Sequence, residues 1–146
     1  QFNTSDGYAH FSSNPLPNVD IEDEQFVMMT MRSHDQYNTT IYGLDDRYRG
    51  IKGNRRVILM NPDDMLDLQI KTRDFVDITS HFNGKVRISK QWIVIPYKIP
   101  KRNIAAYFPE ANELVPLEST ADISNTPTSK WIICTISGQI SASEEE

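Results

Sequence analysis

Residues 28–43 read MMTMRSHDQYNTTIYG, an apolar run that passes directly into a polar one. The apolar half has strand propensity, and Arg32, His34 and a dense set of hydroxyl and amide side chains follow it. Rigid strands commonly present binding loops in this way. Arginine offers a forked, permanently charged donor for phosphate or carboxylate, while Ser, Thr and Asn add neutral hydrogen bonds. The stretch therefore favours a loop that binds a polyanionic ligand over a site of proton transfer.

A plainer interpretation of the same loop stays open at this point. Ser33, Asp35, Asn38 and Thr39 are residue types that commonly form turns and cap helices. Composition alone favours this plainer role. A second signal from elsewhere in the chain is needed to assign a site.

The rest of the chain contains short apolar segments separated by turn signals. Asn61 as N-cap, Pro62 at the first helical position and two acids in the first turn predict a helix from Pro62 to about Leu68. A single helical turn is expected around residues 109–112, and a short extended piece over residues 114–117. We expect strands at about residues 25–31, 55–60, 74–80, 85–89, 92–95 and 130–136. Six or seven short strands with one or two short helices predict a closed, mainly β barrel.

Three strand segments carry more specific expectations. Residues 85–89 alternate polar and apolar side chains, so one face of this strand should be solvated. Residues 92–95 are continuously apolar and should be buried on both sides, with Pro96 closing the strand. Cys134 lies in the last apolar strand, where a thiol is usually buried and inert.

Length and composition predict one globular domain. The chain has 146 residues, of which 24% are charged and 38% hydrophobic. A chain of this size buries about two-thirds of its unfolded surface. No apolar run approaches the ~20 residues of a membrane span, and the start has no signal-peptide core, so we expect no membrane partner.

The formal net charge of −5 argues against broad nucleic-acid binding, so no nucleic-acid partner is expected. Basic residues nevertheless gather in one part of the chain, and local positive potential can coexist with an acidic whole. This basic group consists of Arg32, Arg47, Arg49, Lys52, Arg55 and Arg56. Cys134 is the only cysteine, which excludes an internal disulfide and suits a reducing, cytoplasmic location.

The two ends of the chain differ in composition from the middle. Residues 1–23 are rich in Asn, Ser, Pro, Asp and Gly, which predicts an extended lead-in from a preceding domain of a longer protein. Its aromatic side chains could anchor it to a surface; they are Phe2, Tyr8 and Phe11. We expect a barrel domain at residues 24–137 and a disordered acidic tail at residues 138–146.

Two runs of this sequence resemble a known family. They are RSHDQYNTTIYGLDDRYRG at residues 32–50 and AAYFPEANELVPLESTADISNTPTSK at residues 105–130. They are similar to the opening and the end of the C-terminal molybdopterin-dinucleotide-binding domain of molybdopterin oxidoreductases, in the branch of formate dehydrogenase alpha subunits. The resemblance covers about residues 24–136 and implies a six-stranded double-psi β-barrel.

The resemblance also implies a set of cofactor-binding residues. Arg32 and His34 would contact the pyrophosphate or pterin of the dinucleotide, and one of Thr39 and Thr40 would lie near the pterin. The alternatives are a surface arginine and a histidine whose ring a neighbouring carbonyl satisfies. Composition does not choose between the two threonines.

Two further site residues come from the second run. Asn112 matches the position of a cofactor-binding asparagine, and its amide can donate and accept at the edge of a pterin or guanine. Lys130 matches a lysine of the family ending. The alternatives are a helix C-cap for Asn112 and a solvated strand-end lysine for Lys130.

The sequence departs from the family pattern in three places. Ser129 stands where an aromatic residue is often found. Gln69 and Arg73 stand where relatives often have glycines, so we expect a less tight exit from the helix that begins at Pro62. None of these departures removes a predicted cofactor contact.

The resemblance implies a domain that holds a bis-molybdopterin guanine dinucleotide with molybdenum or tungsten in a formate dehydrogenase-like enzyme. Catalytic residues and metal ligands would come from the remaining domains of the same enzyme, so none is assigned in this chain. The alternative from a different class is a stand-alone β-barrel binding or interaction module without redox activity.

Overall fold

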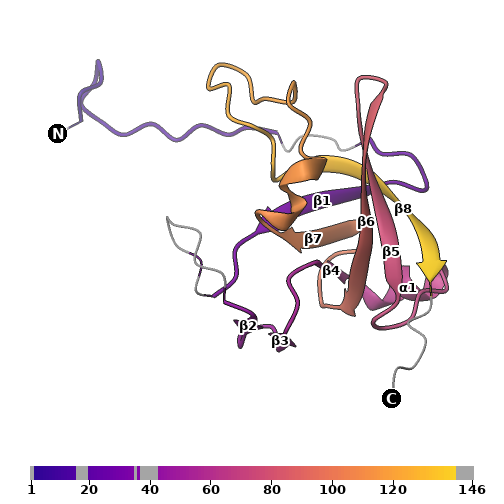
Figure 1. The fold of residues 1–146 in the computed structure, drawn as a ribbon. Coiled ribbons are helices and arrows are strands. Elements are labelled where there is room, and N and C mark those ends of the chain that lie inside the picture. Colours follow the sequence, from indigo (N-terminus) through magenta and orange to yellow (C-terminus); the bar gives the residue numbers. More distant parts are fainter. Residues whose placement is uncertain (1, 16–19, 35, 37–42, 141–146) are drawn as a thin grey trace.

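The computed structural model describes residues 2–15, 20–34, 36 and 43–140. Six strands close into one barrel in the order β1-β7-β4-β6-β5-β8, which confirms the predicted fold class (Figure 1). The barrel strands are β1 (Phe26–Met31), β4 (Val57–Met60), β5 (Phe75–Phe82), β6 (Lys85–Pro96), β7 (Asn103–Tyr107) and β8 (Ile132–Ile140). A separate two-stranded sheet joins β2 (Asp45–Asp46) to β3 (Ile51–Lys52).

The barrel mixes parallel and antiparallel pairs. β1 runs parallel to β7 with Met31 opposite Tyr107, and β4 runs parallel to β6 with Val57 opposite Ile93. The remaining neighbours are antiparallel. This arrangement is consistent with the double-psi barrel. Because β1 and β7 are parallel, their carboxyl ends lie at the same end of the barrel.

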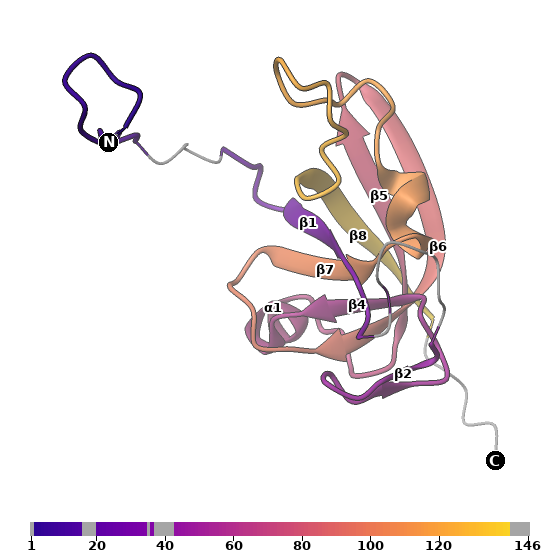
Figure 2. The same ribbon diagram turned by 90° about the vertical axis from the view of Figure 1, so that its left-hand side faces the viewer.

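Hydrophobic residues pack on both sides of the barrel wall. The interior cluster contains Met28, Ile58, Ile78, Trp92 and Cys134, each with no exposed surface. A second cluster lies on the outer face, where Ile51 of β3 packs with residues of β1, β4 and β7. Figure 2 shows the β2–β3 hairpin beside β4. The polar loop is therefore attached to the barrel through an apolar contact.

The strand β6 is longer than the sequence predicted. Residues 85–89 and 92–95 belong to this one strand, and a β-bulge lies in its pairing with β5 between Val76 and Ile78. Trp92 and Val94 face the interior cluster, while Ile93 and Ile95 pack against the outer one. The prediction that this apolar run is covered on both sides is confirmed.

The expectation that one face of residues 85–89 is solvated is confirmed. The apolar side chains form that face, because Val86 and Ile88 are 58% and 57% exposed. Ser89 is buried instead, and Arg87 Nη1 donates to the Glu113 carbonyl at 3.1 Å. The 3-10 helix η1 (Glu110–Leu114) packs on this part of β6 with polar groups, so the inward face of the strand is polar.

The helix α1 (Pro62–Asp67) begins as predicted, with the Asn61 side chain accepting from the Asp63 backbone N–H at 2.8 Å. The expectation of a loose helix exit is wrong. Gln69 takes the left-handed conformation, with φ of 56°. Its N–H bonds to Leu66, and the N–H of Ile70 bonds to Met65 at 2.8 Å. This is the bond pattern of a tight Schellman turn.

Five other segments differ from expectation. The strands β2, β3 and β7 were not predicted, because the first two lie in a polar connection and the third is rich in alanine. Residues 114–117 form no strand, and the final strand reaches Ile140 instead of ending near Ile136.

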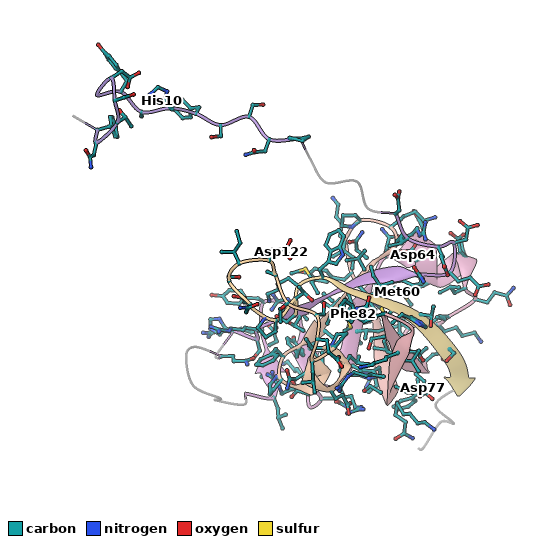
Figure 3. All side chains as sticks on the ribbon, turned by 90° about the horizontal axis from the view of Figure 1, so that it is seen from above. His10, Met60, Asp64, Asp77, Phe82 and Asp122 are labelled. Carbon is teal, nitrogen blue, oxygen red and sulfur yellow. The ribbon has the colours of Figure 1, made fainter. Side chains whose placement is uncertain are left out.

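Residues 2–15 of the lead-in lie apart from the barrel, as the position of His10 relative to Met60 shows (Figure 3). Residues 21 and 22 contact the barrel, because Arg102 donates to both of their carbonyls. The aromatic side chains of the lead-in are exposed, with Phe11 fully so; the set is Phe2, Tyr8 and Phe11. These three exposed side chains therefore do not attach the lead-in to the described part of the barrel. Among the described residues, no helix has the length and apolar character needed to cross a membrane.

Candidate functional site

Three segments that are distant in sequence meet at the carboxyl ends of β1 and β7. The Phe108 N–H donates to the Met31 carbonyl at 2.8 Å, so the chain that leads into η1 passes beside Arg32. The Thr30 N–H donates to the Ser129 carbonyl at 2.9 Å. Figure 1 shows the orange turn η1 at this end of the barrel. The two runs that carry the family resemblance therefore lie side by side.

Arg32 and Lys130 bring two positive charges to this end. Arg32 is exposed, and the Lys130 ammonium donates to the Thr30 carbonyl. Partial burial, and then the positive charge of Arg32, lower the pKa of Lys130 below its usual value. Within residues 2–15, 20–34, 36 and 43–140, no acid forms an ion pair with either side chain. An anion placed between these cations would relieve their repulsion.

His34 lies in the polar loop and contacts other loop residues. Its Nε2 accepts a hydrogen bond from Arg47, and its ring meets the Tyr48 ring edge-on at 4.2 Å between centroids. Because arginine has no acceptor, the neutral His34 must carry its proton on Nδ1. Thr39 and Thr40 lie outside the described residues.

Asn112 is exposed on η1. Its backbone N–H donates to the Pro109 carbonyl at 2.9 Å, and its own carbonyl accepts from Val115 at 3.1 Å. The C-cap of η1 is Val115, so the alternative role of Asn112 as a C-cap is wrong. In the part of the chain that the structure describes, its side-chain amide has no hydrogen bond and so is available to a ligand.

Sequence reasoning missed the most connected residue of this region. Arg55 is 6% exposed, and its Nε donates to Glu110 Oε1 at 2.6 Å in a buried ion pair. Its Nη1 donates to Ser33 Oγ at 2.7 Å, and its Nη2 donates to Gln36 Oε1 at 3.2 Å. Arg55 thus joins the residues that follow β1 to the first residue of η1.

The same guanidinium makes further contacts on both sides. Its Nη2 donates to the Phe108 carbonyl at 3.3 Å and its Nη1 to the Gly43 carbonyl at 3.4 Å. Its centre lies 4.8 Å from the centroid of the Tyr107 ring, within the range of a cation–π contact. The sequence showed Arg55 only as the first residue of a predicted strand and as a member of the basic group, and neither observation reveals these partners.

A second buried network lies beside Arg32. The Tyr107 hydroxyl donates to Asp46 Oδ2 at 2.5 Å, and Arg49 Nη1 donates to the same oxygen at 2.6 Å. Burial raises the pKa of Asp46, but its hydrogen bonds and the positive charge of Arg49 together outweigh burial, and the net pKa is lowered. Burial and the bond to Asp46 raise the pKa of Tyr107. Arg49 also donates to the Arg32 carbonyl at 3.4 Å, so this network reaches the backbone of the predicted site.

Two cavities among the described residues lie away from the predicted site residues. One of about 310 Å³ lies between the β5–β6 hairpin and residues 116–118, and one of about 380 Å³ lies between residues 23–26, α1 and residues 101–102. Within the described ranges, no group of three or more His, Cys, Asp and Glu side chains is placed to hold a metal. The described cations at the ends of β1 and β7 are Arg32 and Lys130.

Comparison with known proteins gives a consistent result. The model of the Molydopterin dinucleotide binding domain matches residues 26–133. An uncharacterized oxidoreductase of Mycobacterium tuberculosis is 50% identical over 138 residues, which is 91% of this chain and 18% of that protein. An uncharacterized oxidoreductase of Mycobacterium bovis has the same identity and coverage. Protein YdeP of Escherichia coli is 38% identical over 111 residues, which is 74% of this chain and 15% of that protein. The chain thus spans less than one fifth of the length of these curated relatives.

Proposed function

Because this chain belongs to the molybdopterin dinucleotide-binding domain family, we propose that it binds a molybdopterin guanine dinucleotide within a larger oxidoreductase. Its longer relatives include proteins named as oxidoreductases, which supports the second half of the proposal. The remaining domains of the same polypeptide would supply the substrate pocket and the metal ligand. The family match makes the stand-alone interaction module the weaker alternative.

The observation that carries this proposal is the pair of cations at the ends of β1 and β7. Arg32 and Lys130 lie close enough for one charge to lower the pKa of the other, and no described acid pairs with them. A pyrophosphate carries the opposite charge and accepts several charge-assisted hydrogen bonds. These two residues therefore fit the phosphates of a dinucleotide.

The neutral groups of the site fit the other parts of the cofactor. The open Asn112 amide can donate and accept at once, which suits the edge of a pterin or guanine ring. The loop that contains His34, Thr39 and Thr40 would contribute further hydrogen bonds. When bound, the cofactor and its molybdenum or tungsten ion supply the redox chemistry, while this chain binds and orients the cofactor.

The finer assignments extend the same proposal. We assign residues 1–23 to the lead-in from the preceding domain, and we extend the barrel expected at residues 24–137 to Ile140, where β8 ends. Residues 141–146 are then assigned to the acidic tail. The likeness of residues 32–50 and 105–130 to formate dehydrogenase alpha subunits supports a formate dehydrogenase-like enzyme. The single cysteine is compatible with a cytoplasmic enzyme.

Cofactor retention by the full-length enzyme tests the proposal. One charge-assisted hydrogen bond contributes about 1.5–3 kcal/mol, so Arg32→Ala should weaken retention about 10- to 150-fold. Lys130→Ala should act in the same direction. Pterin released from the denatured protein and metal measured by mass spectrometry, both after prolonged dialysis, give readouts independent of activity.

Lys85→Ala is the matched control, because Lys85 is an exposed lysine of the β5–β6 hairpin whose ion-pair partner is Glu118. This variant should keep its pterin and metal. Full retention by Arg32→Ala, or equal loss by Lys85→Ala, would show that the two cations at the end of β1 do not hold the cofactor.

A further inference from the structure

We propose that Arg55 is the positioning residue of the cofactor site, and that its ion pair with Glu110 holds the two walls of that site in register. This inference rests on the proposed function. Arg55 is not one of the expected cofactor contacts. Its role is to fix where the groups on either side of it lie.

The two walls come from different parts of the chain. The first wall is the part of the connection from β1 to β4 that ends at Arg55; its described residues are 32–34, 36 and 43–55, and it contains Arg32. The second wall consists of residues 108–112, which follow β7 and begin η1, and it contains Glu110 and Asn112. Arg55 stands at the far end of the first wall and bonds back to Ser33 at its near end. The same side chain bonds across to the second wall.

Only an arginine can make this set of contacts. Three nitrogens of one planar group reach the two Glu110 oxygens, the Ser33 hydroxyl and the Gln36 amide oxygen. A lysine has a single nitrogen, which cannot lie within bonding distance of all these acceptors. The charge of Arg55 therefore attracts the two walls to each other, and the forked shape of its guanidinium group fixes their relative positions.

Arg55 does not itself offer a ligand site. The residues packed around it enclose no space that a cofactor group could enter; they are Ser33, Gly43, Leu44, Asp46, Ile51, Asn54 and Tyr107. Its donors point at protein acceptors, and its flat face lies over the Tyr107 ring. The side chain that binds phosphate in this arrangement is Arg32, one residue before Ser33.

The network of Asp46 completes the positioning of Arg32. Tyr107 lies under Arg55 and donates to Asp46, which pairs with Arg49, which in turn donates to the Arg32 carbonyl. The position of Arg32 is thus fixed by the hydrogen bond from Arg49 to its own carbonyl and by the hydrogen bond from Arg55 to the neighbouring Ser33 side chain. Loss of the Arg55–Glu110 pair should release the loop while the barrel core stays packed.

The test uses the full-length enzyme with Glu110→Gln and Arg55→Lys. Both changes approximately preserve the size of the side chain. Glu110→Gln removes the negative charge of the ion pair, and Arg55→Lys keeps the positive charge but removes the forked guanidinium group. We expect each to lose pterin and metal on dialysis at least about 10-fold faster than wild type. Backbone amides of residues 43–54 should exchange hydrogen faster, while those of β4 should not change. If the Arg55–Glu110 pair contributed only to global stability, hydrogen exchange would be faster both in residues 43–54 and in β4.

Glu113→Gln is the matched control. Glu113 also lies on η1 and pairs with Arg56, the neighbour of Arg55, at 2.9 Å, but that pair does not touch the loop. This variant should keep wild-type retention and wild-type exchange in residues 43–54. Equal loss from Glu113→Gln would overturn the proposal, and so would unchanged retention with Glu110→Gln.

Chemical rescue gives a further readout. Arg55→Ala should lose cofactor, and added guanidinium ion at non-denaturing concentration should restore part of the retention. If Arg55→Ala does not fold, Glu110→Gln and Glu113→Gln decide the question. A wild-type enzyme that contains no pterin would refute the proposed function alone, and amide exchange in the Glu110→Gln variant would then test the Arg55 role by itself.

Discussion

Replacement of Arg73 by glycine should stabilise the barrel, although it removes a side chain. Arg73 is exposed and has φ of 73°, in the left-handed region that residues with a Cβ atom rarely adopt. Its N–H donates to the Val94 carbonyl at 2.8 Å, a bond that glycine would keep. Glycine adopts the left-handed conformation without steric cost, so the substitution fits the backbone geometry.

The magnitude follows from two opposing effects. A left-handed conformation costs an L-residue about 1–2 kcal/mol. Glycine makes the unfolded chain more flexible, which removes about 0.4–1 kcal/mol of the gain. The midpoints of these two ranges give a net stabilisation from Arg73→Gly of about 0.8 kcal/mol. For a chain of this size, the melting temperature should rise by about 2–5 °C.

Urea and thermal unfolding of the variant chain measure this effect. Thr72→Gly provides the control, because Thr72 is exposed in the same turn and does not have a positive φ. It should lose about 0.4–1 kcal/mol through the flexibility of the unfolded chain alone. Arg73→Gly and Thr72→Gly should therefore move the unfolding midpoint in opposite directions. A midpoint for Arg73→Gly at or below the wild-type value would refute the reasoning.

Two further predictions concern the core and the helix start. Burial raises the pKa of Cys134 to about 12, so the thiolate forms only at very high pH and a thiol reagent should modify this residue only as fast as the chain unfolds. Prompt labelling of the folded protein would contradict this. Asn61→Ala should destabilise the chain by about 1 kcal/mol in urea, because Asn61 caps α1 and also donates to the Ile99 carbonyl. Asn61→Asp keeps the cap and should lose less.

Local sequence patterns predicted the parts of the fold that depend on neighbouring residues in the chain. The start of α1 depends on three adjacent residues, and the sequence showed it. The direction of the side chains of β6 depends on η1, which is more than twenty positions away in the chain. Polar contacts from Glu113 to Arg56 and Ser89 make the inner face polar there, and alternation within residues 85–89 carries no information about them.

The candidate site shows the same division. Arg32 and Lys130 were predicted from the family resemblance, and the structure brings their segments together through the pairing of β1 with β7 and β8. Arg55 was not predicted, because its importance comes from partners at positions 33, 36, 108 and 110 that only the folded barrel assembles. Residue types in the sequence identified the possible ligand contacts Arg32 and Lys130. The role of Arg55 could be recognised only from its contacts in the folded chain.

The charge arrangement of the site links binding to folding. A lowered pKa of Lys130 means that its charged form is less favourable in the folded chain than in the unfolded one. Below the lowered pKa the charge therefore reduces the stability of the folded chain, and this loss disappears as the pH rises above that pKa. A bound phosphate would reverse the sign, because it attracts both Lys130 and Arg32 and raises the pKa of Lys130. If the proposed function is right, the repulsion between Arg32 and Lys130 in the unloaded domain would become an attraction to the bound phosphate in the loaded one.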